Sequence, residues 1–228
     1  MILSRKQVYT GRNHTLTTYS FFATIARMKY IERWALMRNA REENLSEHSM
    51  EVGMIAHALC VIGNVRYGKK LDADRAAVIG LYHDASEIIT GDMPTPVKYY
   101  GDEIRTAYKK VEAVAENRLL DKLPTDLAPV YRSIFGTPDP EKENESPDPA
   151  AAEAAESERY MRRLVKAADK LSALIKCMDE TAAGNTEFRT AMQSTMKSLD
   201  AMAAELPELQ DFMEEFLPSY GHTLDELA

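Results

Sequence analysis

Apolar residues recur three or four positions apart along almost all of this 228-residue chain. No segment shows the strict alternation of apolar and polar residues that marks a half-buried strand, so the pattern predicts an all-α fold. The length suits a single globular domain with a substantial core. The expected helices span residues 19–31, 46–61, about 73–91, 102–123, 160–181 and 187–206, and a short amphipathic helix lies in the C-terminal segment.

Two stretches lie outside this helical pattern. Residues 1–18 form an N-terminal extension to a domain that we expect to span residues 19–228. Residues 137–158 hold four prolines, eight acids and no aromatic or large aliphatic side chain. Such a composition buries too little apolar surface to offset its ordering entropy. We therefore expect an acidic insertion, with a mobile first half and an alanine-rich second half that begins a helix.

Composition restricts the partners of the protein. The chain carries 28 basic and 36 acidic side chains, and its net charge of −8 argues against nonspecific binding to nucleic acid. A local basic pocket would still allow a nucleotide substrate. No apolar run approaches the roughly 20 residues that span a bilayer, and the N-terminus lacks a secretory signal. We expect a cytoplasmic protein whose two cysteines, Cys60 and Cys177, are buried thiols.

Four ionisable residues on separate predicted helices form a candidate metal site. His83 and Asp84 are adjacent, His48 lies upstream in NLSEHS, and Asp169 lies downstream in VKAADKLSALIKC. Imidazole and carboxylate ligands together suit one divalent transition ion such as Mn, Co, Zn, Ni or Fe, and suit Mg less well. Four protein ligands around a six-coordinate ion would leave room for a water and a substrate oxygen, and the ion would activate that water.

Each of these residues also has a simpler interpretation. His48, near a helix start, fits a surface or capping histidine, and Asp84 fits an ion pair with a lysine or arginine. His83 and Glu87 are four apart and would share one face of a continuous helix. Asp169 borders a buried apolar stripe, where a carboxylate needs a partner. The remaining histidine in a helical pattern, His57, is expected in the core.

Several segments resemble a known enzyme family. RWALMRN, ENLSEHSMEV, LYHDASEIITGDMPTPVKYY, VKAADKLSALIKC and AAGNTEF are similar to the HD-domain metal-dependent phosphohydrolases, and most closely to the YfbR-type 5′-deoxynucleotidases. The resemblance runs from about Phe21 to the C-terminus. It implies a single HD domain and hydrolysis of nucleoside 5′-monophosphates to nucleoside and phosphate, with deoxyribose preferred. It also implies a homodimer and the same ligand set, His48, His83, Asp84 and Asp169.

The resemblance further suggests roles for the residues around the metal. It places Glu87 and Asp92 beside the ion as catalytic residues, and Arg33 and Trp34 in the substrate pocket. Proton transfer to the leaving 5′-oxygen or from a water requires an acid or a base, and Glu87 suits either role. Asp92 would orient the nucleophile or a ligand histidine.

Recognition of a phosphate dianion requires cationic or hydroxyl donors. Arg33 and Lys98 are the candidate cations and Thr95 is the candidate hydroxyl. Arg38 and Arg41 lie in the same basic stretch and are expected on a solvated face.

Two other functional classes fit parts of the sequence. The same cluster would also serve a phosphohydrolase that acts on a nucleoside triphosphate, a cyclic nucleotide or an alarmone. The short local inventory of basic residues favours a monophosphate. A helical binding module without turnover is the second alternative. Glu87 and Asp92 argue against it, because a purely structural metal site needs neither.

Overall fold

The computed structural model describes residues 18–94, 97, 100–136 and 149–228, and these residues confirm the predicted all-α fold. Within them, the only extended pairing is an isolated bridge between Glu32 and Asn44. None of the helices in the described ranges is long and apolar enough to cross a membrane. The longer helices are α2 (Leu45–Tyr67), α3 (Ala73–Tyr82), α6 (Asp102–Leu120), α7 (Ala128–Phe135), α8 (Pro149–Ala182), α9 (Arg189–Ala203) and α10 (Pro207–Glu215).

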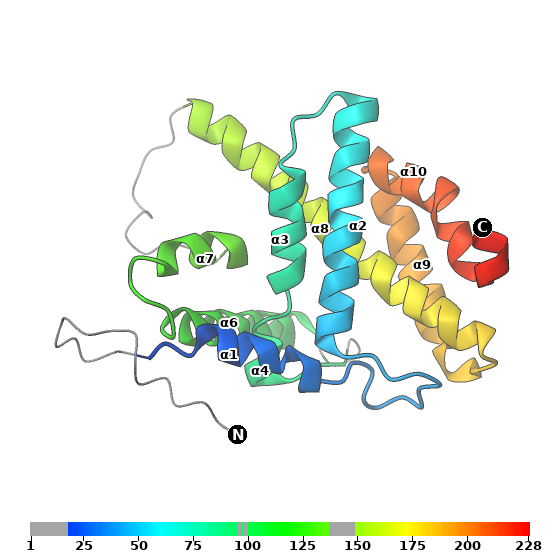
Figure 1. Ribbon diagram of the computed structural model, residues 1–228, viewed down its shortest axis with the longest axis horizontal. Helices are drawn as coiled ribbons and strands as arrows, with labels where there is room; N and C mark the ends of the chain where they lie inside the picture. The colour runs from blue at the N-terminus through cyan, green and yellow to red at the C-terminus, as the bar shows by residue number, and fades with distance from the viewer. Residues whose placement is uncertain (1–17, 95–96, 98–99, 137–148) are drawn as a thin grey trace, which may run out of the picture.

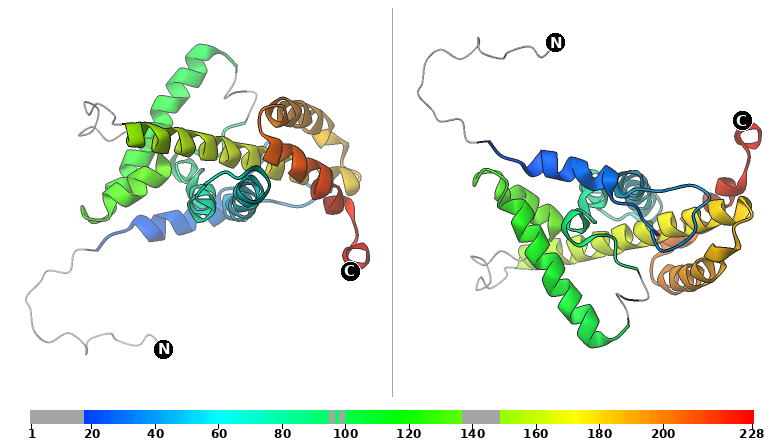
Figure 2. Two further views of the ribbon diagram at one scale, coloured as in Figure 1. Left: turned by 90° about the horizontal axis from the view of Figure 1, so that it is seen from above. Right: turned by 90° about the horizontal axis from the view of Figure 1, so that it is seen from below.

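Short helical segments complete the chain. They are α1 (Phe21–Ile25), α4 (Glu87–Thr90) and the 3₁₀ turns η1 (Ala26–Tyr30), η2 (Thr186–Phe188), η3 (Leu217–Gly221) and η4 (Leu224–Leu227). Helices α2 and α3 lie side by side, and α8 crosses both of them (Figure 1). In Figures 1 and 2, α6 and α7 lie toward one end of the molecule and α9 and α10 toward the other.

Two clusters of buried side chains form the core. The larger joins α2, α3, α8, α9 and α10 and includes Leu59, Leu164, Leu171, Leu199 and Leu209, all of which are inaccessible to solvent. The smaller packs α1 and α6 against the turn after α3 through Phe21, Ala85, Leu119, Leu120 and Leu123. The turn after α3 therefore lies between the two cores.

Helix α2 begins at Leu45, one residue before the predicted start at residue 46. The side chain of Asn44 accepts hydrogen bonds from the backbone N–H groups of Ser46 and Glu47, and Glu47 bonds back to the Asn44 backbone as a capping box. The helix continues past the predicted residue 61 to Tyr67. It ends at Gly68, whose φ of 63° is the left-handed conformation that glycine adopts most easily.

The predicted continuous helix from about residue 73 to Gly91 is wrong. Helix α3 ends at Tyr82, and α4 begins at Glu87. The connection is a tight turn with hydrogen bonds of the 3₁₀ type, in which each N–H bonds the carbonyl three residues earlier. They run from Ala85 N–H to the Tyr82 carbonyl and from Glu87 N–H to the Asp84 carbonyl. The imidazole Nδ1 of His83 also lies 2.7 Å from the Gly80 carbonyl oxygen. A side chain that bonds the backbone one turn earlier competes with the helical pattern.

Two further differences concern the second half of the chain. Helix α7 was not predicted, because its eight residues are too few for a clear period. Helix α8 begins at Pro149, so the alanine-rich half of the acidic insertion is helical, as expected, and extends the helix predicted over residues 160–181. The expected mobile half falls on residues 137–148, which lie outside the described residues, as does most of the predicted extension over residues 1–18.

Helices α2 and α3 approach each other through two glycines. A Cβ atom on Gly80 would lie 2.8 Å from the Cα of Gly53, and a Cβ on Gly53 would lie 3.1 Å from the Ala77 carbonyl oxygen. Gly53 lies near the start of α2, and Gly80 lies near the end of α3. The crossing therefore holds the His48 end of α2 close to the His83 turn.

The substitution Gly80→Ala should force the two helices apart. We expect the free energy of unfolding to fall by about 1–3 kcal/mol, the usual cost of overpacking. Urea denaturation followed by circular dichroism measures this change. The matched control is Gly221→Ala, since no atom lies within 4 Å of a Cβ built at that position. Equal stability of the two variants would contradict the close crossing.

Candidate metal centre

Four ionisable side chains from three elements converge at the junction of α2, α3 and α8. His48 comes from the first turn of α2, His83 and Asp84 from the turn after α3, and Asp169 from the middle of α8. His48 Nε2 lies 3.2 Å from Asp169 Oδ1 and 3.6 Å from Asp84 Oδ2. His83 Nε2 lies 3.1 Å from Asp84 Oδ2 and 3.9 Å from Asp169 Oδ1. The structure thus brings together all four residues that the sequence pattern selected.

The protonation of His83 indicates what belongs between these groups. A carbonyl oxygen can only accept a hydrogen bond, so the His83 Nδ1 that contacts the Gly80 carbonyl carries the proton. In the neutral ring, Nε2 then presents a lone pair toward the carboxylates. The Nε2 atoms of both histidines are buried and make no hydrogen bond of good geometry. Beside two carboxylates, His83 Nε2 either carries a second proton or donates its lone pair to a cation, and a bound metal would take the place of that proton.

A single divalent ion fits this set of donors. One ligand atom each from His48, His83 and Asp84 lie within 4.8 Å of one another, and Asp169 borders the group. Two imidazole nitrogens and two carboxylates are ligands that suit first-row transition metals.

Without a metal, the charges of the cluster compensate each other only in part. Burial works against an ionised Asp84, but His83 and His48 hold its pKa at about 2. Burial opposes ionisation of Asp169 as well, and the two histidines lower its pKa well below the usual range. Burial would lower the pKa of His83, yet Asp84 and Asp169 raise it well above its usual value. The carboxylates therefore stay ionised and attract a cation at neutral pH.

Arg33 is a buried cation at the edge of the cluster. Its side chain is 10% exposed, and its guanidinium lies 3.4 Å from Asp84 Oδ2 and 3.5 Å from Glu43 Oε2. Burial would lower the pKa of Arg33, but Asp84, Asp169 and Glu43 raise it. Asp84 therefore fits both interpretations made from the sequence. It faces the two histidines as a metal ligand would, and it also faces an arginine.

Trp34 adopts a strained backbone conformation beside the cluster. Its φ of 57° is unusual for a residue other than glycine. Its backbone N–H donates a hydrogen bond to Asp92 Oδ2 over 3.1 Å, and its indole packs on Phe188 with ring centroids 5.4 Å apart. Asp92 therefore fixes the loop that carries Arg33 and Trp34, a contact that the sequence did not predict.

The other predicted site residues fall in three groups. Glu87, the first residue of α4, is 5% exposed, and its backbone N–H donates a hydrogen bond to the Asp84 carbonyl over 3.0 Å. Arg38 and Arg41 are 91% and 79% exposed at their side chains, which agrees with the solvated face expected for them. Thr95 and Lys98 lie outside the described residues.

A buried carboxylate that the sequence did not predict anchors the loop over residues 33–43 to α8. Glu180 accepts hydrogen bonds from the backbone N–H groups of Ala40 and Arg41, at 2.7 and 3.2 Å, and from Asn185 Nδ2 at 2.7 Å. It also pairs with the buried ammonium of Lys176. Burial disfavours the charge, but the Lys176 ammonium and the backbone N–H groups lower the Glu180 pKa to about 2. Asn185 belongs to the AAGNTEF segment, which carries part of the family resemblance. That segment was the only feature of the sequence that pointed to this anchor.

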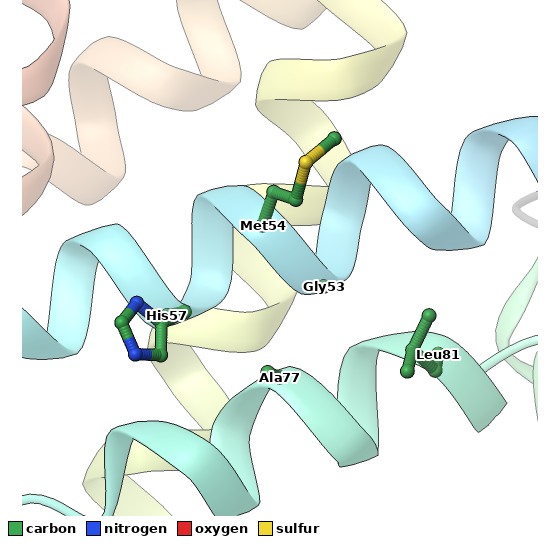
Figure 3. A pocket seen from close by; sticks show the side chains of 5 residues that line it. All are labelled: Gly53, Met54, His57, Ala77 and Leu81. Atoms are coloured by element: carbon green, nitrogen blue, oxygen red, sulfur yellow. The ribbon is translucent and has the colours of Figure 1, made fainter.

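His57 lies away from the metal cluster, and the prediction that it is a core histidine is wrong. Its side chain is 45% exposed, so it is not a core histidine, and its Nε2 lies 3.7 Å from Asp74 Oδ1. It lines a shallow groove of about 350 Å³ between α2 and α3, with Gly53, Met54, Ala77 and Leu81 (Figure 3). His57 lies one turn after Gly53, at the edge of the contact between α2 and α3, where its side chain reaches solvent. The two cysteines are buried free thiols, as predicted.

Comparison with known proteins agrees with this geometry. The family model for YfbR-like 5′-deoxynucleotidases matches residues 20–220. The chain belongs to the YfbR-like 5′-deoxynucleotidase family. A 5′-deoxynucleotidase of Shewanella oneidensis is 46% identical over 208 residues, which cover 90% of this chain and 96% of that protein. The 5′-deoxynucleotidase YfbR of Escherichia coli is 44% identical over 91% of this chain and 95% of its own length.

Solved structures share the fold. An HD-domain phosphohydrolase from Listeria innocua superposes with a TM-score of 0.68 at 22% identity and covers 88% of each chain. A cyanophage S-2L HD phosphohydrolase, bound to dA and one catalytic Zn²⁺ ion, gives a TM-score of 0.57 at 19% identity over 88% of this chain and 96% of that one. The described residues therefore form an HD domain, as the sequence resemblance implied.

The substitution Asn185→Ala should loosen the loop over residues 33–43. It removes hydrogen bonds from Asn185 Nδ2 to the Arg38 carbonyl and to Glu180. We expect a loss of about 1–3 kcal/mol of stability and greater access of a quencher to Trp34, the only tryptophan. Acrylamide quenching of fluorescence measures that access. Asn117→Ala, which removes side-chain hydrogen bonds on α6, is the control and should leave quenching unchanged. Unchanged quenching in Asn185→Ala would contradict the anchoring role.

Proposed function

We propose that this chain hydrolyses deoxyribonucleoside 5′-monophosphates to nucleoside and phosphate, with deoxyribose preferred to ribose, at the cluster of His48, His83, Asp84 and Asp169. The observation that carries the proposal is the convergence of these four side chains with buried, unsatisfied imidazole nitrogens. Relatives up to 46% identical are 5′-deoxynucleotidases. Both facts support the same reaction.

One divalent transition metal completes the proposed centre. His48, His83, Asp84 and Asp169 would hold it, and Mn, Co, Zn, Ni and Fe all suit these ligands better than Mg does. When bound, such an ion supplies Lewis acidity at a phosphate oxygen and lowers the pKa of a water. The catalytic Zn²⁺ of the cyanophage phosphohydrolase supports this choice of metal class.

The residues of the chain do the remaining work. Arg33 is fixed by Asp84 and Glu43, so its guanidinium is preorganised to attract the phosphate dianion. Glu87 exchanges a proton with the attacking water or with the leaving 5′-oxygen. Asp92 holds the Trp34 backbone, and Trp34 packs against the sugar. Thr95 and Lys98 complete the phosphate contacts in this proposal.

The proposal also covers assembly and location. The sequence resemblance supports a homodimer in the cytoplasm, with a mass twice the 25.7 kDa of one chain. Triphosphates, cyclic nucleotides and alarmones are less favoured substrates, because Arg33 is the one buried arginine among the described residues and already faces two carboxylates. The buried position of Glu87 beside the cluster argues against a binding module without turnover.

A phosphate-release assay tests the proposed reaction. The protein is stripped with a chelator and supplied with Mn, Co, Zn, Ni or Mg, one at a time. We expect metal-dependent release from 5′-deoxyribonucleotides and much less from ribonucleotides or 3′-monophosphates. Release only from triphosphates, cyclic nucleotides or alarmones would contradict the proposed monophosphate substrate and would identify one of these classes in its place. No release with any metal would favour the binding module.

The substitution Glu87→Gln should separate proton transfer from metal binding. Loss of a general acid or base costs about 10²–10⁴-fold in kcat, whereas the metal content should stay at the wild-type level. Steady-state kinetics and elemental analysis measure the two quantities. Glu103→Gln on the exposed start of α6 is the matched control and should change neither. Normal turnover in Glu87→Gln would show that Glu87 is a spectator.

A further inference from the structure

Two residues of α8 hold the imidazole of His48 from both sides. His48 Nε2 lies 3.2 Å from Asp169 Oδ1, and His48 Nδ1 lies 2.9 Å from Ser172 Oγ. Asp169 and Ser172 are three residues apart, so they occupy one face of α8. His48 and Ser172 are inaccessible to solvent. Ser172 Oγ is therefore the hydrogen-bond partner of Nδ1, with Glu43 Oε1 farther away at 3.8 Å, while Nε2 faces the metal cluster.

The hydrogen bonds continue from Ser172 to Glu51. Ser172 Oγ lies 2.6 Å from Glu51 Oε2, and Glu51 follows His48 by three residues on α2. Two residues of α2 and two of α8 thus lie in contact around the imidazole. His48 faces Asp169 on the side of the metal cluster, and Ser172 and Glu51 lie on the opposite side of the ring.

The single hydroxyl proton fixes the direction of these bonds. A carboxylate only accepts, so Ser172 donates its proton to Glu51. The Ser172 oxygen then accepts a hydrogen bond from His48 Nδ1–H. A neutral imidazole with its proton on Nδ1 has its lone pair on Nε2, which is the nitrogen that faces Asp84 and Asp169.

The two histidines of the cluster direct Nδ1–H toward different acceptors. His83 uses the Gly80 carbonyl, which can never donate. A hydroxyl can rotate and donate, so Ser172 alone would not fix the His48 tautomer. Glu51 accepts the hydrogen bond of the Ser172 hydroxyl, so the hydroxyl cannot rotate to donate to His48.

We propose that Ser172 and Glu51 are positioning residues that keep the proton of His48 on Nδ1 and so make Nε2 a metal donor. This inference rests on the proposed metal centre. Neither residue touches substrate or metal; both act through His48. Outer hydrogen bonds of this kind orient a ligand imidazole and raise its basicity.

The tautomer itself is the first test. Two-bond ¹H–¹⁵N correlation spectra of the metal-free wild-type protein identify which nitrogen of His48 carries the proton. We expect the proton on Nδ1. A protonated Glu51 would reverse both hydrogen bonds, and a spectrum with the proton on Nε2 would overturn the proposal. This measurement needs neither bound metal nor activity.

Metal affinity is the second test. Competition with a chromogenic chelator gives the Kd for Zn²⁺ or Co²⁺. We expect Ser172→Ala and Glu51→Met to raise the Kd about 10- to 100-fold, with unchanged helix content. Ser172→Thr retains the hydroxyl and should restore affinity. Thr181→Ala removes another hydroxyl of α8, which bonds the Cys177 carbonyl, and should leave the Kd unchanged.

The outcomes separate the two proposals. Equal affinity of wild type, Ser172→Ala and Glu51→Met would overturn the positioning role and leave the metal centre standing. Absence of metal binding by the wild type would overturn the metal centre, and the tautomer spectrum would still decide how Ser172 and Glu51 hold His48. Weak binding by Ser172→Thr, with intact folding, would also count against the hydroxyl.

Discussion

Two carboxylates and two imidazole nitrogens converge where three helices meet, and this buried set needs positive charge, either as protons on the imidazoles or as a bound metal ion. His83 Nε2 points toward carboxylate oxygens 3.1 and 3.9 Å away, because the Gly80 carbonyl accepts the hydrogen bond of Nδ1–H on the other side of the ring. Burial of such a set is costly without positive charge. The close crossing of α2 and α3, the break after Tyr82 and the register of α8 all serve to bring these groups together.

The loop from Arg33 to Glu43 depends on a second polar arrangement. Glu180 on α8 accepts two backbone N–H groups of the loop, and Asp92 accepts a third at Trp34. These carboxylates hold Arg33 at the edge of the cluster and Trp34 in a conformation that few residues adopt. The loop is therefore fixed before substrate arrives, which favours an ordered pocket over one that forms on binding.

The sequence predicted much of this, because helical periodicity and ligand spacing are local properties. The all-α fold and the set of His48, His83, Asp84 and Asp169 could both be predicted. The break between α3 and α4 was not, since it depends on a side-chain contact between His83 and Gly80. The exposure of His57 depends on how α2 packs beside α3. The role of Glu180 depends on contacts across about 140 residues of chain, which no periodicity records.

The wide separation of the ligands along the chain has a thermodynamic consequence. His48 and Asp169 lie on α2 and α8, and almost the whole middle of the chain intervenes. An unfolded chain cannot offer both to one ion, so binding and folding are linked. An ion at a thousand times its Kd would add about 4 kcal/mol to the unfolding free energy. The free metal concentration around the protein would thus set how much of it stays folded, as well as how fast it works.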